Sequence, residues 1–218
     1  MNDLKQQLQA IRSLEVLPIE ESQKLDITSV KKGGFIELNS DTWQIINYYS
    51  YLDVKWKNFS PREKDYWVIE LELYSLTKGI KTFVEWEIDD ELEVCLTDVS
   101  IKLRDIQYEG KSLTRKDLAY IEDEEEGEIK YKGTKYFYSD DDTWAGLFFK
   151  NANDAKNKSN SIPLRIYEFE SESDTGMGQY LSIESWHENE DKAEREAFIS
   201  HSIKSIDIQV LQTSEQLN

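Results

Sequence analysis

Glutamates and a tryptophan in the segment 164–190 have the residue types of a reactive or ligand-binding site. Glu168, Glu184 and Trp186 lie on two strand-like runs that predict a β-hairpin, and Glu170 follows on the first run. Two carboxylates beside a stacking ring are groups that glycosidases use to protonate a leaving group and to attack the sugar or activate water. The sequence does not fix their separation, so a structural role in the sheet is the competing interpretation.

A second segment, 67–90, has the same hairpin plan and more carboxylates. Its apolar residues alternate with Glu70 and Glu72 on one strand and with Glu85 and Glu87 on the next. Any register that joins the apolar faces also gathers these glutamates on one face, which we expect to be an outer face of the sheet. Like charges opposite one another destabilise a sheet, so the face requires compensation.

Three sources could compensate this carboxylate face. Lys102 and Arg104 alternate with apolar residues on a predicted neighbouring strand. Solvent and salt could screen the charges instead. The third source is a bound cation or a basic partner.

The two hairpins together supply a candidate set of ligand-binding residues. Tyr and Trp rings beside carboxylates can hold an amine through charge and cation–π contact, which favours a small cation such as a polyamine. The candidates are Trp86, Glu85, Tyr167, Glu168, Glu184 and Trp186.

Composition excludes several classes of function. The formal net charge is −18, from 44 acidic and 26 basic residues, so a phosphate backbone or an anionic lipid surface would be repelled. With one cysteine, Cys95, and two histidines, the chain forms no intrachain disulfide and no Cys/His zinc cluster. We interpret Cys95 as a structural thiol.

Cofactor and nucleophile motifs are absent as well. The chain has no glycine-rich nucleotide loop and no nucleophile elbow, and the acidic run 139–143 lacks the spacing of an EF-hand. We therefore predict no cofactor, no metal and no enzymatic activity. The N-terminus has no apolar leader, and no apolar run approaches the roughly 20 residues of a membrane span, which predicts a cytoplasmic protein without membrane insertion.

Strand patterns dominate the rest of the chain and predict a mainly β fold with a minor α component. We expect an antiparallel barrel or sandwich made of two related β-hairpin halves, with a short helix over Asn2–Arg12. A second short helix is predicted over Ser112–Tyr120 with Ser112 or Thr114 as its cap, a polar loop over 151–161, and a helix or polar crossover over 191–202. The expected divisions of one compact domain are 1–25 (helix and linker), 26–120 (first β half), 121–127 (acidic connector), 128–212 (second β half) and 213–218 (tail).

An internal repeat supports the two halves. Residues 34–43 match 127–136 at an offset of 93, residues 70–72 match 168–170 at an offset of 98, and residues 84–85 match 183–184 at an offset of 99. A slowly drifting offset is what loops of different length produce. The alternative is that all β-hairpins look alike at this level.

The two hairpin segments also resemble a known family. The runs Trp67…Glu70-Leu71-Glu72…Phe83-Val84-Glu85 and Arg165-Ile166-Tyr167-Glu168-Phe169…Leu181-Ser182-Ile183-Glu184-Ser185-Trp186 are similar to strands of the bacterial family called domain of unknown function 4178, over roughly residues 30–211. The resemblance implies a β-rich cytoplasmic domain without an established activity. Some relatives carry Cys-pair zinc motifs, and this chain lacks them.

Three functional hypotheses follow. Relatives in that family are often encoded beside membrane-stress proteins of the phage-shock type and polyamine-synthase-like enzymes, so the resemblance favours a non-catalytic module that binds a protein partner in a membrane-stress complex. The alternative is a β-barrel that binds a small cationic ligand. A hydrolase using Glu168 or Glu184 is the third.

Overall fold

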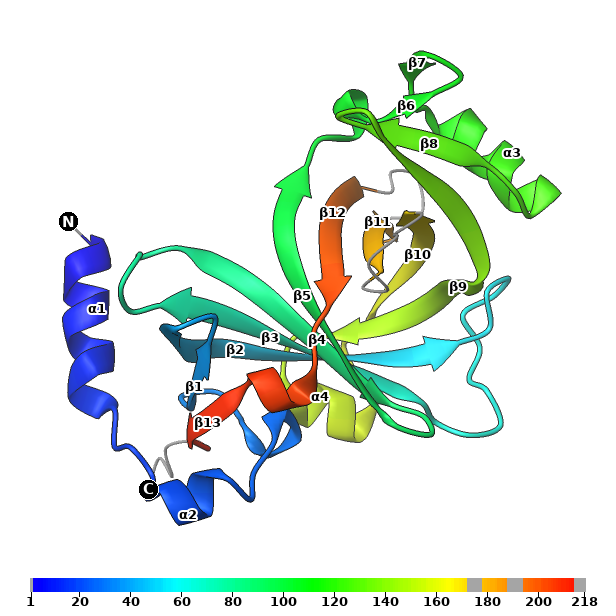
Figure 1. The fold of residues 1–218 in the computed structure, drawn as a ribbon. Helices are drawn as coiled ribbons and strands as arrows, with labels where there is room; N and C mark the ends of the chain where they lie inside the picture. The colour runs from blue at the N-terminus through cyan, green and yellow to red at the C-terminus, as the bar shows by residue number, and fades with distance from the viewer. Residues whose placement is uncertain (1, 172–177, 188–193, 214–218) are drawn as a thin grey trace.

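A computed structural model describes residues 2–171, 178–187 and 194–213, and antiparallel strands dominate it (Figure 1). This confirms the predicted mainly β fold. Thirteen strands of the described chain join in one sheet, and a pairing between its two longest strands closes eight of them into a ring. In ring order these are β2 (Asp41–Val54), β3 (Trp67–Ser75), β4 (Lys81–Ile88), β5 (Leu92–Ile101), β12 (Glu194–Ser202), β11 (Gln179–Trp186), β10 (Ile162–Ser171) and β9 (Thr134–Phe149).

The ring consists of two halves with the same order of elements, as the repeat predicts. The first half starts with β1 (Phe35–Leu38), which turns into β2, and the second with β8 (Glu128–Tyr131), which turns into β9. Both turns have two residues with positive φ: Asn39 and Ser40 at 53° and 57°, and Lys132 and Gly133 at 48° and 90°. That conformation suits the twist of a tight hairpin.

Each half ends by crossing to the other half. Strands β5 and β12 run into the 3₁₀ helices η2 (Leu103–Asp105) and η3 (Ser205–Asp207). The next strand, β6 (Gln107–Tyr108) or β13 (Gln209–Gln212), then pairs with the first strand of the opposite half: β6 with β8, and β13 with β1. A short strand β7 (Lys111–Ser112) extends the β6 edge. The halves are therefore interlocked rather than separable.

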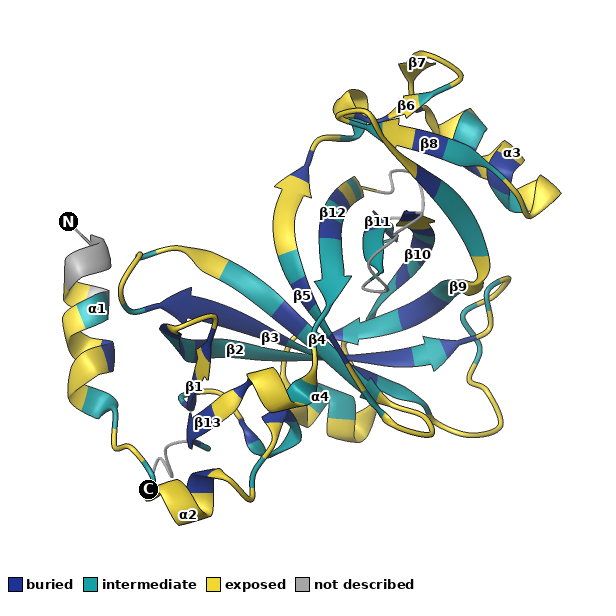
Figure 2. Ribbon diagram, viewed as in Figure 1, coloured by how far each residue is buried: buried dark blue, intermediate teal, exposed yellow. Residues whose placement is uncertain are grey.

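Apolar side chains of the ring strands lie mainly on the outer face of the ring. One core packs Leu71, Val84 and Val94 of the first half against the 3₁₀ helix η1 (Ile27–Ser29) and strand β13. A second core packs Phe169 and Ile183 of the second half against helix α3 (Arg115–Glu124). Figure 2 shows the result for β3, which is largely buried, while the rim strand β7 is exposed.

The two predicted helices are present, with different ends. Helix α1 (Asn2–Ser13) packs through Ala10 on Phe35 and Leu211. Helix α3 begins after Thr114, whose side chain forms a capping box with Asp117. The predicted acidic connector 121–127 is wrong in part, because α3 continues to Glu124. Its residue Ile121 is fully buried in the second core, and this burial extends the helix.

Three other local predictions are wrong. The expected polar loop 151–161 contains helix α4 (Ala152–Asn157), and residues 194–202 form β12, the fourth ring strand of the second half, which pairs with both β11 and β5. Lys102 and Arg104 lie at the 3₁₀ helix η2 and are exposed, so they do not face the glutamates. A last short helix, α2 (Ile19–Ser22), precedes the first half.

None of the helices in the described ranges is both long and apolar enough to cross a membrane. Residues 172–177, 188–193 and 214–218 lie outside these ranges, as do the predicted hairpin turn at Gly176, the start of the predicted 191–202 element and most of the predicted tail.

Candidate functional site

The ring encloses a cavity of about 1210 Å³ whose wall is acidic and aromatic. This volume exceeds the range of about 300–1,000 Å³ that is usual for small-molecule sites. The aromatic lining residues are Tyr49, Tyr51, Tyr66, Phe83, Trp144, Phe148, Tyr180, Trp186 and Phe198. The acidic ones are Asp53, Glu70, Glu85, Glu87, Glu91, Glu93, Asp141, Asp142, Glu168, Glu184, Glu194 and Glu196.

Strand alternation places the glutamates of the first half inside the ring. Because Leu71 and Val84 face the outer core, Glu70, Glu85 and Glu87 must face the cavity. The prediction that they share one face is confirmed for these three, but the face is an inner one rather than an outer one. The reason is that the apolar faces are covered from outside, which leaves the interior to the polar face.

Pairing in the first half brings like charges directly opposite one another. Glu70 of β3 pairs with Glu85 of β4, and Glu87 of β4 pairs with Glu93 of β5. Residues at such positions have Cβ atoms roughly 5 Å apart, where two carboxylates repel. This arrangement costs stability when both carboxyls of a pair are ionised.

The second half contributes Glu168 and Glu184 from the hairpin β10–β11 on the opposite side of the ring. Glu168 pairs with Ser182, whose hydroxyl donates to a Glu168 oxygen at 2.9 Å. Glu184 pairs with Ile166 on one side and Glu196 on the other. The two hairpins that carry the sequence repeat thus line one cavity from opposite walls.

The pKa values of these carboxyls are raised. Burial, with smaller effects from Glu85 and Glu196, raises the pKa of Glu184 to about 8. Burial and the Glu85 charge raise the pKa of Glu168 to about 8, although its bond from Ser182 acts in the other direction. Burial and the Glu87 charge raise the pKa of Glu85 to about 7. At neutral pH the cavity therefore holds a mixture of protonated and ionised carboxyls.

The pKa of Glu70 is raised as well. Burial, followed by the charges of Glu184 and Glu85, raises its pKa well above the usual range, and the Tyr51 hydroxyl opposes this only in part. Within the described ranges, no lysine, arginine or histidine forms an ion pair with Glu70, Glu85, Glu168 or Glu184. Two cations of the neighbourhood are engaged elsewhere: Arg62 binds Asp53 at 2.6 Å and Lys81 binds Glu72 at 2.7 Å.

The entrance of the cavity is also acidic. Exposed lining residues include Glu91, Glu93, Asp141, Asp142, Glu194 and Glu196, against two exposed lysines, Lys150 and Lys204. A cleft lined mainly by one sign of charge concentrates ions of the opposite sign. The entrance therefore favours the approach of cations.

Aromatic rings form one side of the cavity wall. Phe148 lies 5.1 Å from Tyr51, 5.1 Å from Trp186 and 5.4 Å from Tyr49 between ring centroids. The Trp186 contact is edge-on at 89°. Such a cluster offers π faces and apolar surface beside the carboxylates, which suits an organic cation with methylene groups.

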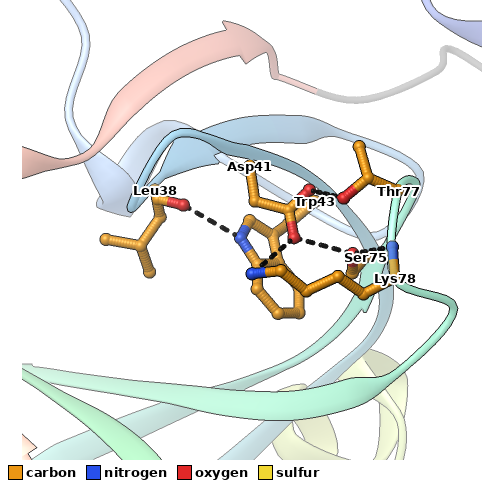
Figure 3. A network of polar contacts seen from close by, with 6 residues as sticks. All are labelled: Leu38, Asp41, Trp43, Ser75, Thr77 and Lys78. Carbon is orange, nitrogen blue, oxygen red and sulfur yellow. Dashed lines mark hydrogen bonds and ion pairs between the residues drawn. The ribbon is translucent and has the colours of Figure 1, made fainter.

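A buried carboxylate outside the cavity shows a contrasting arrangement (Figure 3). Asp41 is 3% exposed and accepts hydrogen bonds from Ser75 at 2.7 Å and Thr77 at 2.6 Å, with the Lys78 ammonium at 3.3 Å. Burial alone would raise its pKa, but the Thr77, Ser75 and Lys78 contacts outweigh burial and lower it. Asp41 is a structural carboxylate with hydroxyl donors and a cation, whereas Glu70, Glu85, Glu168 and Glu184 have no cationic partner among the described residues.

The structure places four of the six candidate ligand residues in the cavity wall: Glu85, Glu168, Glu184 and Trp186. The other two point to the opposite faces of their strands. Trp86 packs against the first outer core. Tyr167 lies in the second outer core, where its hydroxyl donates to Glu122 at 3.2 Å and its ring meets Trp56 edge-on.

Sequence reasoning did not single out Tyr49, Tyr51 and Phe148, nor Cys95 as a lining residue. The alternation Tyr49–Tyr51–Asp53 along one strand was an available signal, because three polar or amphipathic residues at period two indicate a face outside the main core. Burial and the Glu85 charge raise the pKa of Cys95 to about 12, so its thiol is protonated and unreactive.

No group of three or more His, Cys, Asp or Glu residues within 2–171, 178–187 and 194–213 has an arrangement that could hold a metal ion.

Comparison with known proteins gives one match. Neither the curated proteins nor the solved structures contain a match to this chain. Residues 31–205 match the model of a domain of unknown function, DUF4178, in agreement with the resemblance of the two hairpins. The chain therefore belongs to the DUF4178 family.

Proposed function

We propose that this protein is a binding protein for a small organic polycation, such as a polyamine, which it takes into the cavity of the β ring. The observation that carries the proposal is the set of four inward-facing glutamates, Glu70, Glu85, Glu168 and Glu184, without ion-pair partners in the described chain. These four glutamates are half-buried, and an ionised, unpaired carboxylate held away from bulk water is costly unless it takes up a proton or a cation compensates it. A ligand with two or more ammonium groups would supply that compensation.

The composition of the wall supports an organic cation over a metal ion. The glutamates come from opposite walls and alternate with aromatic rings, and they do not form a metal-ligand cluster among the described residues. Ammonium groups bind through charge and cation–π contact without a fixed coordination geometry. The methylene groups between them would pack on Tyr51, Phe148 and Trp186.

The pKa pattern supports binding over hydrolysis. A glycosidase needs two carboxyls whose environments separate their pKa values, one acid and one ionised base or nucleophile. Here the pKa values of Glu168 and Glu184 are both raised to about 8, mainly by burial. Neither is held ionised beside a protonated partner, so the hydrolase hypothesis has less support.

Calorimetric titration with spermidine at pH 8 and physiological salt tests the proposal. At this pH Glu85 is largely ionised, Glu168 and Glu184 are about half ionised, and the amine stays protonated, as lysine does. We expect binding with proton release, seen as a heat that depends on the ionisation enthalpy of the buffer. The variant Glu168→Gln/Glu184→Gln should bind at least about tenfold more weakly, from the loss of two charge-assisted contacts.

Glu37→Gln is the matched control, because Glu37 is exposed on β1 and outside the cavity. It should leave the spermidine affinity unchanged. Absence of both heat and thermal stabilisation with millimolar spermidine, putrescine and spermine would refute the proposal. Equal weakening in the control would also refute it, since the effect would then come from net charge.

An interaction module in a membrane-stress complex stays a second candidate function. It is supported by apolar side chains on α1 that are about half exposed, Leu8 at 45% and Ile11 at 53%. An amphipathic helix of this kind can dock in a groove of a partner protein. Cross-linking in native cells should recover a near-stoichiometric partner with the wild type and lose it in Leu8→Gln/Ile11→Gln, if this candidate is right. A cytoplasmic location stays a prediction.

A further inference from the structure

Arginines gather on the outer face of the ring in a chain that is strongly acidic elsewhere. Arg165 of β10 and Arg195 of β12 flank Ser185 of β11 in one cross-strand row. Arg115 is in the first turn of α3, the helix that packs on the outer core of the second half beside Tyr167 and Ile183. After burial, its charge is the next cause that lowers the pKa of Arg195. We call these three residues the arginine cluster.

Aromatic residues hold Arg165 in place. Its guanidinium lies 5.1 Å from the ring centroids of both Trp56 and Phe59. Its Nε and Nη2 donate to the Trp56 carbonyl at 3.4 and 3.2 Å. The His187 ring in turn lies 5.5 Å from Phe59. Arg165 is therefore preorganised, and these two bonds use only part of its donor set.

The positive charge of the cluster is not compensated by the described chain. None of the three guanidiniums forms an ion pair within the described ranges. Glu122 is close, but its two oxygens already accept bonds from Trp56 at 2.6 Å and Tyr167 at 3.2 Å. The Nε atom of Arg195 and Nε2 of His187 are buried without a hydrogen-bond partner. Unsatisfied buried donors are costly, and an acceptor that filled the site would remove that cost.

We infer that the arginine cluster is a binding site for a small phosphate-type dianion. Guanidinium groups offer forks of N–H donors that match the oxygens of phosphate, and three of them beside one carboxylate leave a surplus of two positive charges. That surplus favours a dianion over a monocarboxylate. The site is distinct from the cavity, because Arg165 and Arg195 lie on the opposite strand faces from Ile166 and Glu196, which line the cavity.

Phosphate titration of the full chain, followed by NMR at constant ionic strength, tests this inference. Inorganic phosphate should shift the signals of the arginine side chains and of residues 56–59 with a saturable curve, whereas acetate should shift them at least about tenfold less strongly. Arg195→Gln and Arg115→Gln should each weaken phosphate binding by about tenfold or more. Arg115 is exposed at the helix start, so its variant keeps the fold intact.

Arg12→Gln is the control with the same charge change, since Arg12 lies in the last turn of α1, far from α3 (Figure 1). It should bind phosphate as the wild type does. Glycerol 2-phosphate identifies the source of the group: equal or tighter binding assigns a phosphate ester, and weaker binding assigns free phosphate. Non-saturable shifts, equal response to acetate, or equal weakening in Arg12→Gln would overturn the inference.

Discussion

The Asp41 corner and the cavity bury carboxylates in opposite ways. Asp41 receives two hydroxyl donors and the Lys78 ammonium, and its pKa falls despite burial. Glu184 faces Glu196 across the strand pair and lies near Glu85, and its pKa rises to about 8. The same fold gives Asp41 a cationic partner and gives the cavity glutamates none among the described residues. This difference is the basis of the proposal that the cavity glutamates serve a ligand rather than the fold.

The same contrast exists on a smaller scale between the two repeated hairpins. In the first, Glu70 is directly opposite Glu85. In the second, the corresponding Glu168 is opposite Ser182, which donates to it at 2.9 Å, and Glu184 is displaced along the partner strand. The repeat has kept a glutamate at each position while changing the register between them. The first hairpin therefore carries the stronger repulsion.

The largest expected effect is on the pH dependence of stability. Carboxyls with raised pKa bind protons in the folded state that the unfolded chain releases above its usual pKa of 4.5. Their stabilisation is complete below about 4.5 and is lost as pH rises through about 8. The free energy of unfolding should fall by roughly 3–5 kcal/mol between pH 5.5 and 8, measured by urea unfolding. Saturating spermidine should reduce this fall, and a flat profile without ligand would contradict the proposed electrostatics.

The second largest effect on stability should come from removing Asp41, the carboxylate that has hydroxyl donors and a cation. Asp41→Ala leaves the buried Ser75 hydroxyl and the Thr77 hydroxyl without their acceptor and should lower the free energy of unfolding by about 3 kcal/mol at pH 7. The pKa of Asp41 is lowered in the folded protein, so Asp41 stabilises the fold above its usual pKa, and this stabilisation is lost as pH falls below about 4. The cavity carboxyls with raised pKa have the opposite pH dependence. Urea unfolding at pH 7 and pH 3 measures both. If Asp41→Ala is as stable as the wild type at pH 7, Asp41 does not stabilise the fold and does not differ from the cavity glutamates in this respect.

Neutralising the unsatisfied carboxylates should have the opposite effect. Glu168→Gln/Glu184→Gln removes two charges that are costly to bury, so the free energy of unfolding at pH 8 should rise by about 2 kcal/mol. At pH 5.5, where both carboxyls are protonated in the folded state, the change should be small. Glu37→Gln, at an exposed position, should change neither value by more than about 0.5 kcal/mol. Destabilisation at pH 8 would show that these glutamates have a structural role.

Much of the fold could be predicted from local patterns. Period-two alternation marks the ring strands, and the two-residue hairpin turns at Asn39 and Lys132 preserve the repeat offset of 93. Alternation alone, however, does not state which face of a strand is inside. Here Leu71 and Val84 are covered from outside by elements distant in sequence, such as β13, so the glutamates face inward. Ring closure by β2 and β9 depends on such long-range pairing.

The candidate site was predictable to a similar extent. Glu85, Glu168, Glu184 and Trp186 share the inward parity of their strands, but Trp86 and Tyr167 have the opposite parity. Consecutive residues of a strand point to opposite faces, so alternation alone predicts that Trp86 and its neighbour Glu85 do not share a face. The arginine cluster could not be predicted, because the row Arg165–Ser185–Arg195 requires the register of three strands.

The smallest effect should come from removing a single hydroxyl that donates to a cavity glutamate or to Asp41. Ser182 donates to Glu168 and opposes its raised pKa, so Ser182→Ala should move that pKa further above 8 and lower stability at pH 8 by less than about 1 kcal/mol. Thr77→Ala should raise the pKa of Asp41 toward its usual value of 3.8, at a cost of about 1 kcal/mol at pH 7. Side-chain carboxyl NMR titrations measure both values. Ser182→Ala should raise a pKa that is already above the usual range, and Thr77→Ala should raise one that is below it. A fall in either pKa would show that the hydroxyl does not stabilise the ionised carboxylate.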